Sequence, residues 1–330
     1  MERNKLTLIL LLIPFLSSCF KEDDPIQPRG GEVFSVSESI YTHQSYFNLG
    51  SKSIVAVNPV DIWDLSFESA DTGWVVRINS GRFLGIYSSG TSDPTAVTSV
   101  PPEAEWKYDK SDGNRDSTAT GKWISPDFST PSNEVYVLGI NDGVKYTPYK
   151  KIVFTSLVSG VYSFSFSDMN GSNSATYSIS KDPSRNFVYF SFSDGGKTVN
   201  VEPEKKGWDF VFTQYTTTLY TDEGVATPYF VRGALSNPNG VEVALDTLIG
   251  YTDITVSDLS TFDFSARADA IGHDWKDVQV EETSASYSIR DNYTYIIRDV
   301  SGKYFKLRFK GFYNDAGSPG YPRFEIGSLQ

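Results

Sequence analysis

The sequence has 330 residues, of which 39% are hydrophobic and 15% aromatic, so it can bury two cores of ordinary size and is not a disordered chain. Its net charge of −12 argues against a nucleic-acid partner, because neutralising phosphates needs clustered Lys and Arg. The 22 Phe and 20 Tyr residues, together with Val, Thr and Ser, suit pleated sheets better than helices, so the composition predicts an all-β fold.

The N-terminus predicts export and anchoring rather than a folded element. Arg3 and Lys5 precede an apolar run over residues 6–16 that is too short to span a bilayer, so residues 1–18 are predicted to be a signal peptide. Residues 16–19, LSSC, resemble a bacterial lipobox, which implies that Cys19 is acylated and holds the protein on the outer membrane. Cys19 is the only cysteine, so a disulfide within the chain is excluded.

Residues 19–32 are predicted to form a flexible tether, because they contain two Pro and two Gly residues and no apolar periodicity. The acidic run at residues 21–24, KEDD, resembles the signal that sends Bacteroidetes lipoproteins to the outer face of the outer membrane. A solvated linker without that role is the alternative. We therefore expect a lipid-anchored protein at the cell surface.

Short alternating segments beyond the tether predict antiparallel strands. Strands are expected within residues 33–57 and at 63–67, 74–78, 135–140, 151–154 and 161–166. Residues 88–133 are rich in Ser, Thr, Pro and Gly and predict a long loop insertion of the kind that often binds ligands, with a short helix beginning at residue 101. The turn sequence at 182–184 predicts a boundary between a domain over 33–182 and a second over 183–330.

The two predicted domains repeat one motif. A Trp-Asp-x-x-Phe pattern occurs twice at an offset of 145 residues (208 minus 63), and a Tyr-Phe pair recurs at an offset of 143 (189 minus 46). Offsets that drift without changing the order of the motifs are typical of a tandem duplication with loop insertions. We interpret the repeated residues as structural landmarks, with the Asp as a cross-strand hydrogen-bonding residue: Trp63, Asp64 and Phe67 in the first copy, and Trp208, Asp209 and Phe212 in the second.

The second copy has the clearer strand pattern. Strands are predicted at 187–192 and 228–233, a turn at 237–240 (NPNG), and one helical turn at 257–260. Residues 293–299 and 303–312 predict a hairpin. In its second strand alternate residues should be buried, and the intervening residues should form an exposed basic face, Lys306, Arg308 and Lys310.

Several segments of the second copy resemble the HmuY-like lipoproteins of Bacteroidetes. They are WDFVF at 208–212, residues 229–240, IGHDWK at 271–276, YIIRDVSGKYFKLRF at 295–309 and PRFE at 322–325. The resemblance covers residues 187–330 closely and 36–180 through the repeat. It implies two tandem antiparallel β domains with at most short helices, and capture of haem outside the cell for an outer-membrane receptor. It also implies axial ligation of the haem iron by His or Met side chains.

The chain offers few side chains that could ligate haem iron. His43 and His273 are its only histidines, and Met169 is its only methionine beyond the initiator. The resemblance places one of the family's iron-ligating side chains a few residues after the tryptophan of the Gly-x-Trp segment. Residues 278–280 (VQV) and 126–128 (PDF) stand there in the two copies, so neither copy keeps a ligand at that position.

We take His273 as the candidate haem or metal ligand, with Trp275 and Tyr251 beside it in a ligand-binding cleft. The alternative for His273 is a structural histidine that hydrogen-bonds near Asp274. Because the repeated motifs indicate scaffold, binding chemistry is expected in the loops that the copies do not share, at 88–133 and 236–282.

No nucleophile with a positioned base, carboxylate pair or metal cluster is visible in the sequence, so we expect no enzyme. The predicted function is non-catalytic capture of a ligand at the cell surface, with haem or a related tetrapyrrole as the leading candidate. The alternative is an interaction module that binds a protein or glycan partner and has lost haem binding. Carbohydrate degradation is a third and more distant hypothesis.

Overall fold

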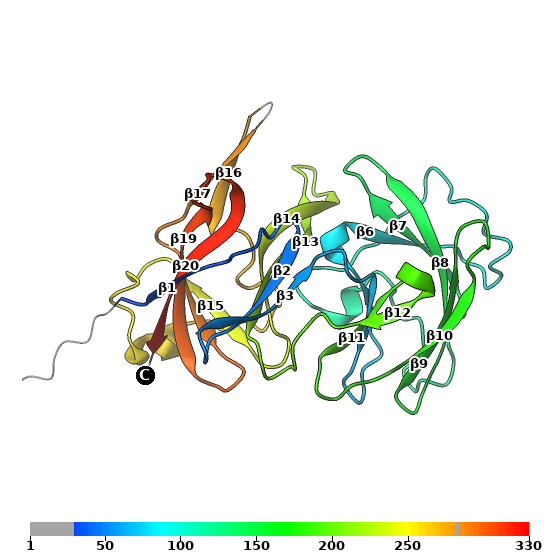
Figure 1. The fold of residues 1–330 in the computed structure, drawn as a ribbon, viewed down its shortest axis with the longest axis horizontal. Helices are drawn as coiled ribbons and strands as arrows, with labels where there is room; N and C mark the ends of the chain where they lie inside the picture. Colours follow the sequence, from blue (N-terminus) through cyan, green and yellow to red (C-terminus); the bar gives the residue numbers. More distant parts are fainter. Residues whose placement is uncertain (1–29, 282–283, 330) are drawn as a thin grey trace, which may run out of the picture.

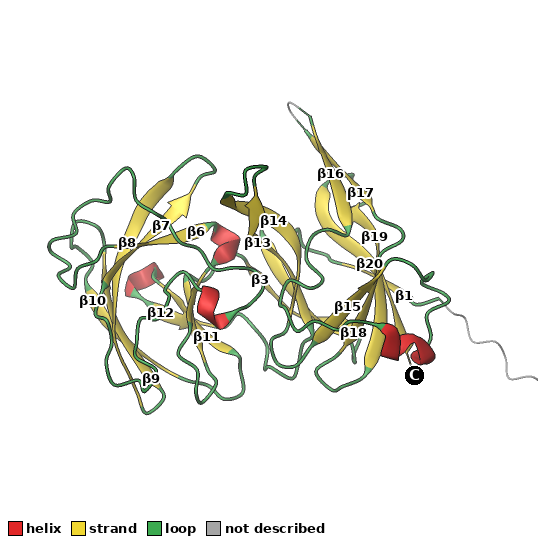
Figure 2. Cartoon of the chain, turned by 180° about the vertical axis from the view of Figure 1, so that it is seen from behind, coloured by secondary structure: helices red, strands yellow, loops and turns green. Residues whose placement is uncertain are grey.

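The computed structural model describes residues 30–281 and 284–329, and within these ranges the chain is β-structure with only short 3-10 helices (Figures 1 and 2). The all-β prediction is therefore confirmed. The 3-10 helices are η1 (Ser80–Arg82), η2 (Arg115–Ser117), η3 (Ser193–Gly195) and η4 (Val256–Thr261). No helix of the described residues is long and apolar enough to cross a membrane. The predicted signal peptide, Cys19 and the tether up to residue 29 lie outside the described residues.

Two hydrophobic cores divide the structure into two packing units, and the first unit comprises residues 61–206. It contains two antiparallel sheets with the strand orders β10-β9-β8-β7-β6 and β12-β11-β4-β5. The strands are β4 (Leu65–Glu68), β5 (Val76–Ile78), β6 (Leu84–Ser88), β7 (Val135–Asn141), β8 (Tyr146–Val158), β9 (Val161–Ser167), β10 (Ala175–Ser180), β11 (Phe187–Ser191) and β12 (Lys197–Val199).

The second unit combines residues 30–60 with residues 207–329. Its sheets have the orders β1-β20-β19-β18-β15 and β14-β13-β2-β3, and β16 and β17 form a projecting hairpin (Figure 1). The strands are β1 (Glu32–Ser35), β2 (His43–Asn48), β3 (Ser53–Pro59), β13 (Phe210–Tyr220), β14 (Ala226–Ser236), β15 (Glu242–Asp246), β16 (Lys276–Val280), β17 (Ala285–Ile289), β18 (Thr294–Arg298), β19 (Tyr304–Tyr313) and β20 (Pro319–Leu329).

Each unit contains a hairpin from the other sequence repeat. The Tyr-Phe strand β2 of the first repeat pairs with β13 of the second, and the Tyr-Phe strand β11 of the second repeat pairs with β4 of the first. The predicted domains 33–182 and 183–330 therefore mark the sequence repeats but differ from the packing units. The sequence could not reveal this exchange, because both hairpins carry the same motif residues and offer either partner an equivalent strand.

The motif aspartates bind the exchanged hairpins. Asp209 accepts the backbone amide of Leu49 at 2.6 Å and that of Val300 at 3.0 Å, and Asp64 accepts the amide of Phe192 at 2.8 Å. Both aspartates are at most 1% exposed, and burial raises the pKa of both carboxyls. Each aspartate thus bonds to the residue that directly follows a strand from the other repeat, Leu49 after β2 and Phe192 after β11.

The motif tryptophans lie where the two units meet. Trp208 packs edge-on against Tyr46, and Trp63 packs edge-on against Tyr189, each pair with ring centroids 5.0 Å apart. The hydroxyls of Tyr46 and Tyr189 hydrogen-bond to each other, which joins the two aromatic pairs. The motif phenylalanines lie instead in the separate cores, Phe67 in the first unit and Phe212 in the second.

The predicted hairpin at 293–312 forms as β18 and β19, with a turn at Gly302, whose φ is 84°. The expectation of a fully exposed basic face on β19 is wrong for Lys306, which is 5% exposed. Its Nζ donates to the carbonyls of Tyr251 at 2.6 Å and Ile254 at 3.1 Å, because the segment before η4 covers this side of the sheet.

Two local predictions about helices have different outcomes. The segment from residue 101 forms turns rather than a helix, and its Trp106 stacks on Tyr146 with centroids 4.6 Å apart. The helical turn near residue 257 is present as η4 and begins at a capping box between Thr255 and Asp258.

Candidate functional site

Two of the three residues predicted to line one cleft, Trp275 and Tyr251, lie on opposite faces of β19. Trp275 is fully buried and stacks on Phe309, with ring centroids 3.8 Å apart. Tyr251 lies near Lys306 Nζ and Arg308 Cζ, which are 4.8 and 4.3 Å from its ring centroid. Alternate residues of a strand point to opposite faces of the sheet. The structure therefore does not bring Trp275 and Tyr251 together.

His273 lies in a segment that is held closely between β14 and β16. Gly272 and Ala234 exchange two backbone hydrogen bonds of 2.9 and 3.1 Å, and Trp275 Nε1 donates to the Gly272 carbonyl at 3.2 Å. A Cβ on Gly233 would lie 2.2 Å from that carbonyl oxygen, so glycine is required for this approach. The backbone position of His273 is thus fixed by packing.

The imidazole of His273 is half-buried, and its Nε2 lies 3.4 Å from Asp274 Oδ1. Desolvation lowers the pKa of His273, so its ring is neutral at physiological pH. A neutral imidazole can ligate a metal, but His273 lines neither of the two cavities found between the units.

The other histidine, His43, lines an open groove of about 750 Å³ between the two units. This volume is within the range of small-molecule and cofactor sites. The groove walls come from the ends of β2 and β3, from η1, from the turn between β7 and β8, and from β14. The lining is largely apolar or aromatic, with Tyr41, Pro59, Val60, Phe83 and Phe230 among its residues.

Nδ1 of His43 is the ring nitrogen that contacts the protein. Thr42 Oγ1 lies 3.0 Å from Nδ1 and 3.2 Å from the carbonyl of Ser39, and Glu38 Oε2 lies 3.9 Å from Nδ1. When the Thr42 hydroxyl donates to Ser39, it accepts from Nδ1, and Nδ1 carries the ring proton of the neutral imidazole. Nε2 then holds the free lone pair, and it has no hydrogen-bond partner among the described residues. This is the arrangement that a metal-ligating imidazole needs.

A pair of stacked rings forms an apolar wall of the groove. Phe83 and Phe230 are parallel to within 2°, with centroids 5.2 Å apart, and they come from different units. Phe83 has φ 55° and ψ 40°, a left-handed conformation that is strained for a bulky residue. In this conformation the ring of Phe83 packs against Phe230 and lines the groove.

The positions that the family resemblance assigns to an axial ligand, 278–280 and 126–128, carry neither His nor Met. Val278 and Val280 are 49% and 77% exposed on β16, at the side of the projecting hairpin. In the first repeat, Phe128 packs against the core. Exposed apolar side chains therefore replace a ligand in one copy, and a packed ring replaces it in the other.

Sequence reasoning gave His43 little weight, although one signal was available. His43 precedes the repeated Tyr-Phe pair by three positions, where the second copy has Asn186. The histidine is thus a residue that the two copies do not share. The groove walls were not predictable, because they join segments from both repeats that lie far apart in the chain.

Comparison with known proteins identifies one family. Residues 184–326 match the family model described as HmuY protein, and no curated protein sequence matches the chain significantly. The chain is similar to three solved structures, each aligned over at least 90% of both chains. These are a putative lipoprotein from Bacteroides fragilis NCTC 9343 (13% identity, 91% of each chain, TM-score 0.23), a putative HmuY-like heme binding protein from Bacteroides vulgatus ATCC 8482 (8%, 90% of this chain and 91% of that one, 0.24) and apo PinO from Porphyromonas gingivitis (9%, 91% and 97%, 0.25).

The matched region begins just before β11 and ends within β20, so it contains β11, β12 and nearly all of the second-unit strands from residue 207 onward. It includes the segments WDFVF, IGHDWK and PRFE on which the sequence resemblance rests. Residues 184–326 of this chain are thus a HmuY-family region, as those motifs predict.

Proposed function

We propose that this protein captures haem or a related tetrapyrrole without catalysis, and that His43 supplies the axial ligand. The observation that carries the proposal is the imidazole of His43, whose Nδ1 lies 3.0 Å from the Thr42 hydroxyl and whose Nε2 has no hydrogen-bond partner among the described residues. The HmuY-family region supports haem as the ligand class.

The groove fits a tetrapyrrole in size and in chemistry. A volume of about 750 Å³ with an apolar lining suits a large flat ring that must leave water. The stacked pair Phe83 and Phe230 offers a planar wall, and Tyr41 adds another aromatic surface near the histidine. One histidine supplies one ligand, so the second axial position of the iron would take water or an outside ligand.

A hemin titration of the soluble form lacking residues 1–24 tests the proposal. We expect saturable growth and a shift of the Soret band, because an imidazole ligand changes the electronic state of haem iron. In His43→Ala the affinity should fall about tenfold or more, equivalent to a loss of about 1.4 kcal/mol. His273→Ala is the matched control and should bind hemin as the unaltered protein does.

Other outcomes have clear meanings. Loss of binding in His273→Ala with full binding in His43→Ala would move the ligand to the turn between β14 and β16. Absence of saturable binding, together with an unchanged melting temperature in hemin, would refute haem capture. It would favour the alternative function, a surface module that binds a protein or glycan partner.

We further propose that acylated Cys19 anchors the protein in the outer membrane, at the cell surface, and that captured haem passes to an outer-membrane receptor. The LSSC sequence at 16–19 and the following acidic run support this location. Labelled palmitate should be incorporated covalently into the protein but not into its Cys19→Ser variant. Protease added to intact cells should digest the protein. Resistance of the protein to that protease would contradict surface exposure.

A further inference from the structure

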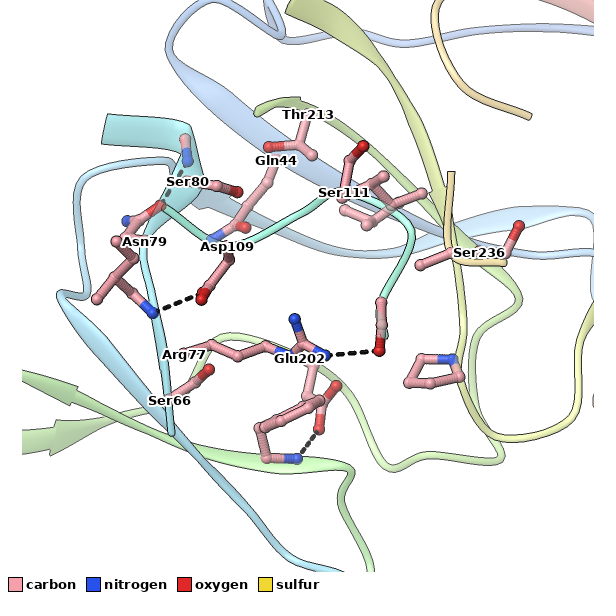
Figure 3. A pocket seen from close by; sticks show the side chains of 18 of the residues that line it. Gln44, Ser66, Arg77, Asn79, Ser80, Asp109, Ser111, Glu202, Thr213 and Ser236 are labelled. Atoms are coloured by element: carbon pink, nitrogen blue, oxygen red, sulfur yellow. Dashed lines mark hydrogen bonds between the residues drawn. The ribbon is translucent and has the colours of Figure 1, made fainter. Parts of the chain in front are cut away.

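A second cavity of about 460 Å³ lies between the facing sheets of the two units (Figure 3). Its walls are β4, β5 and β11 of the first unit and β2, β13 and β14 of the second. Strand alternation sends Leu65 and Phe67 into the first core, while Ser66 between them lines the cavity. The faces that would be solvated in an isolated unit therefore enclose this space.

The two walls differ in polarity at positions that the repeat makes equivalent. Ser66 pairs with Arg77 across β4 and β5, and Val211 pairs with Leu235 across β13 and β14. Ser66 and Val211 each immediately precede the motif phenylalanine, so the two cross-strand pairs correspond. All four residues line the cavity. At these equivalent positions the first-unit wall is therefore cationic and polar and the second-unit wall is apolar. The first wall also carries Glu68, Asp109 and Glu202, and the second carries Gln44, Thr213 and Gln214.

Arg77 has hydrogen-bonding capacity that the protein does not use. Its Nη2 donates to the carbonyl of Gly113 at 2.7 Å, and the ring of Phe187 lies 5.9 Å from its Cζ. Among the described residues it forms no ion pair. A guanidinium has five N–H donors in a planar fork that suits two oxygen atoms of one acceptor group. Figure 3 shows Arg77 among the side chains that line the cavity.

The acidic residues of the cavity are already engaged by the backbone. Asp109 accepts one amide with each oxygen, at 2.9 and 2.7 Å, and Glu202 Oε1 accepts two amides at 2.6 and 2.8 Å. Burial raises the pKa of Glu202 to about 7, so part of its population is neutral at physiological pH. Glu68 and Asp112, the other acidic lining residues, also accept backbone amides, and the Asp109 carboxylate acts electrostatically on Arg77. Arg77 is thus the lining arginine that is without an ion pair among the described residues and keeps N–H donors for a ligand.

Further hydrogen-bond donors line the cavity. Three lining side chains carry buried N–H groups without a partner among the described residues, Gln44 Nε2, Trp63 Nε1 and Trp208 Nε1. Lys110 is an exposed lining residue, and Arg115, which is also exposed, pairs with Glu68 at 3.1 Å. The partnerless N–H groups and Arg77 are thus the donors that a ligand would find inside.

We propose that this cavity binds a small organic carboxylate, with its carboxylate on Arg77 and its apolar body against Val211, Leu235 and the aromatic side chains. Charge-assisted bidentate hydrogen bonds from a guanidinium select carboxylates over uncharged groups of the same shape. The cavity adjoins the His43 groove at Gly81 and Gln214, but Arg77 does not line that groove and His43 does not line the cavity, so this binding does not depend on haem capture.

Tryptophan fluorescence of the soluble form lacking residues 1–24 tests the proposal, because Trp63 and Trp208 line the cavity. Phenylacetate and 3-phenylpropionate, which do not fluoresce in the tryptophan band, are the probes, and phenylacetamide is the uncharged match for phenylacetate. We expect saturable quenching by both acids at millimolar concentration or below, and affinity weaker by about tenfold or more for the amide. Binding of the acids should weaken between pH 6 and pH 8, as Glu202 loses its proton.

Arg77→Gln should reduce the affinity for phenylacetate to that for phenylacetamide, while Arg323→Gln, an exposed arginine on β20, should change neither. Melting curves show whether Arg77→Gln remains folded. If it does not, the ratio of the affinities of the unaltered protein for phenylacetate and phenylacetamide tests the proposal instead. Equal affinity for acid and amide, or no saturable quenching by either acid, would overturn the proposal.

Discussion

Residues 61–206 expressed alone should fold cooperatively, whereas residues 207–330 alone should not. The first unit contains all of its strands in one continuous segment, β4 to β12. The second unit needs β1, β2 and β3 from residues 32–59, which supply four core side chains at most 2% exposed: Val36, Ile40, Phe47 and Leu49. Burying each such side chain contributes about 1.5–3 kcal/mol, so their loss removes about 6–12 kcal/mol. That is comparable with the whole stability of a domain.

Circular dichroism and denaturant titration of the two fragments check this prediction. The matched control joins residues 30–60 to residues 207–330 through a flexible linker and should restore a cooperative transition. Such a linker is feasible because Asn58 Nδ2 lies 2.7 Å from the carbonyl of Val201, near the start of the second segment. Cooperative folding of residues 207–330 alone would contradict the requirement for the hairpin from residues 32–59.

Replacing Asp209 by Ala should lower the free energy of unfolding by about 2–4 kcal/mol. The change leaves the buried amides of Leu49 and Val300 without an acceptor, and each unsatisfied buried group costs about 1–3 kcal/mol. Asp209→Asn retains one acceptor oxygen and should lose less. Urea titration followed by near-ultraviolet circular dichroism gives both values.

The effect should be specific to the motif aspartates. Asp64→Ala should also destabilise, since it removes the acceptor for the amide of Phe192 and leaves Arg82 without its carboxylate. Asp116→Ala is the control, because Asp116 pairs with Lys122 at the surface and should change stability by less than about 0.5 kcal/mol. A similar loss at Asp116 and Asp209 would contradict the role assigned to the motif.

The fold class was predictable, because alternating Tyr, Phe and Val side chains indicate strands whatever their partners are. The hairpin at 293–312 was predictable for the same reason, since its turn and both strands are local. The exchange of hairpins was not, because Tyr46-Phe47 and Tyr189-Phe190 carry the same information in both repeats. Pairing between identical motifs is decided by chain connections and loops rather than by residue type.

The candidate site was less accessible to sequence reasoning than the fold. Gly272, His273 and Trp275 form a recognisable segment, but its Trp is a core residue stacked on Phe309. The groove at His43 and the cavity at Arg77 exist only where the two units meet. The proposed ligand-binding residues of both sites, however, are positions at which the two copies differ. His43 corresponds to Asn186, and Arg77 corresponds to Leu235.

The ring nitrogens of the two histidines give the most direct test of the central claim, that His43 is the haem ligand. The chain has only two histidines, so a protein labelled with ¹⁵N-histidine shows two imidazole systems, and each serves as a control for the other. Gallium protoporphyrin, which is diamagnetic, can replace hemin in this measurement. We predict that Nδ1 of free His43 is protonated and that its Nε2 resonance shifts on binding, while His273 keeps its free-state shifts. Movement of the His273 resonances alone, or of neither histidine at saturation, would contradict the account.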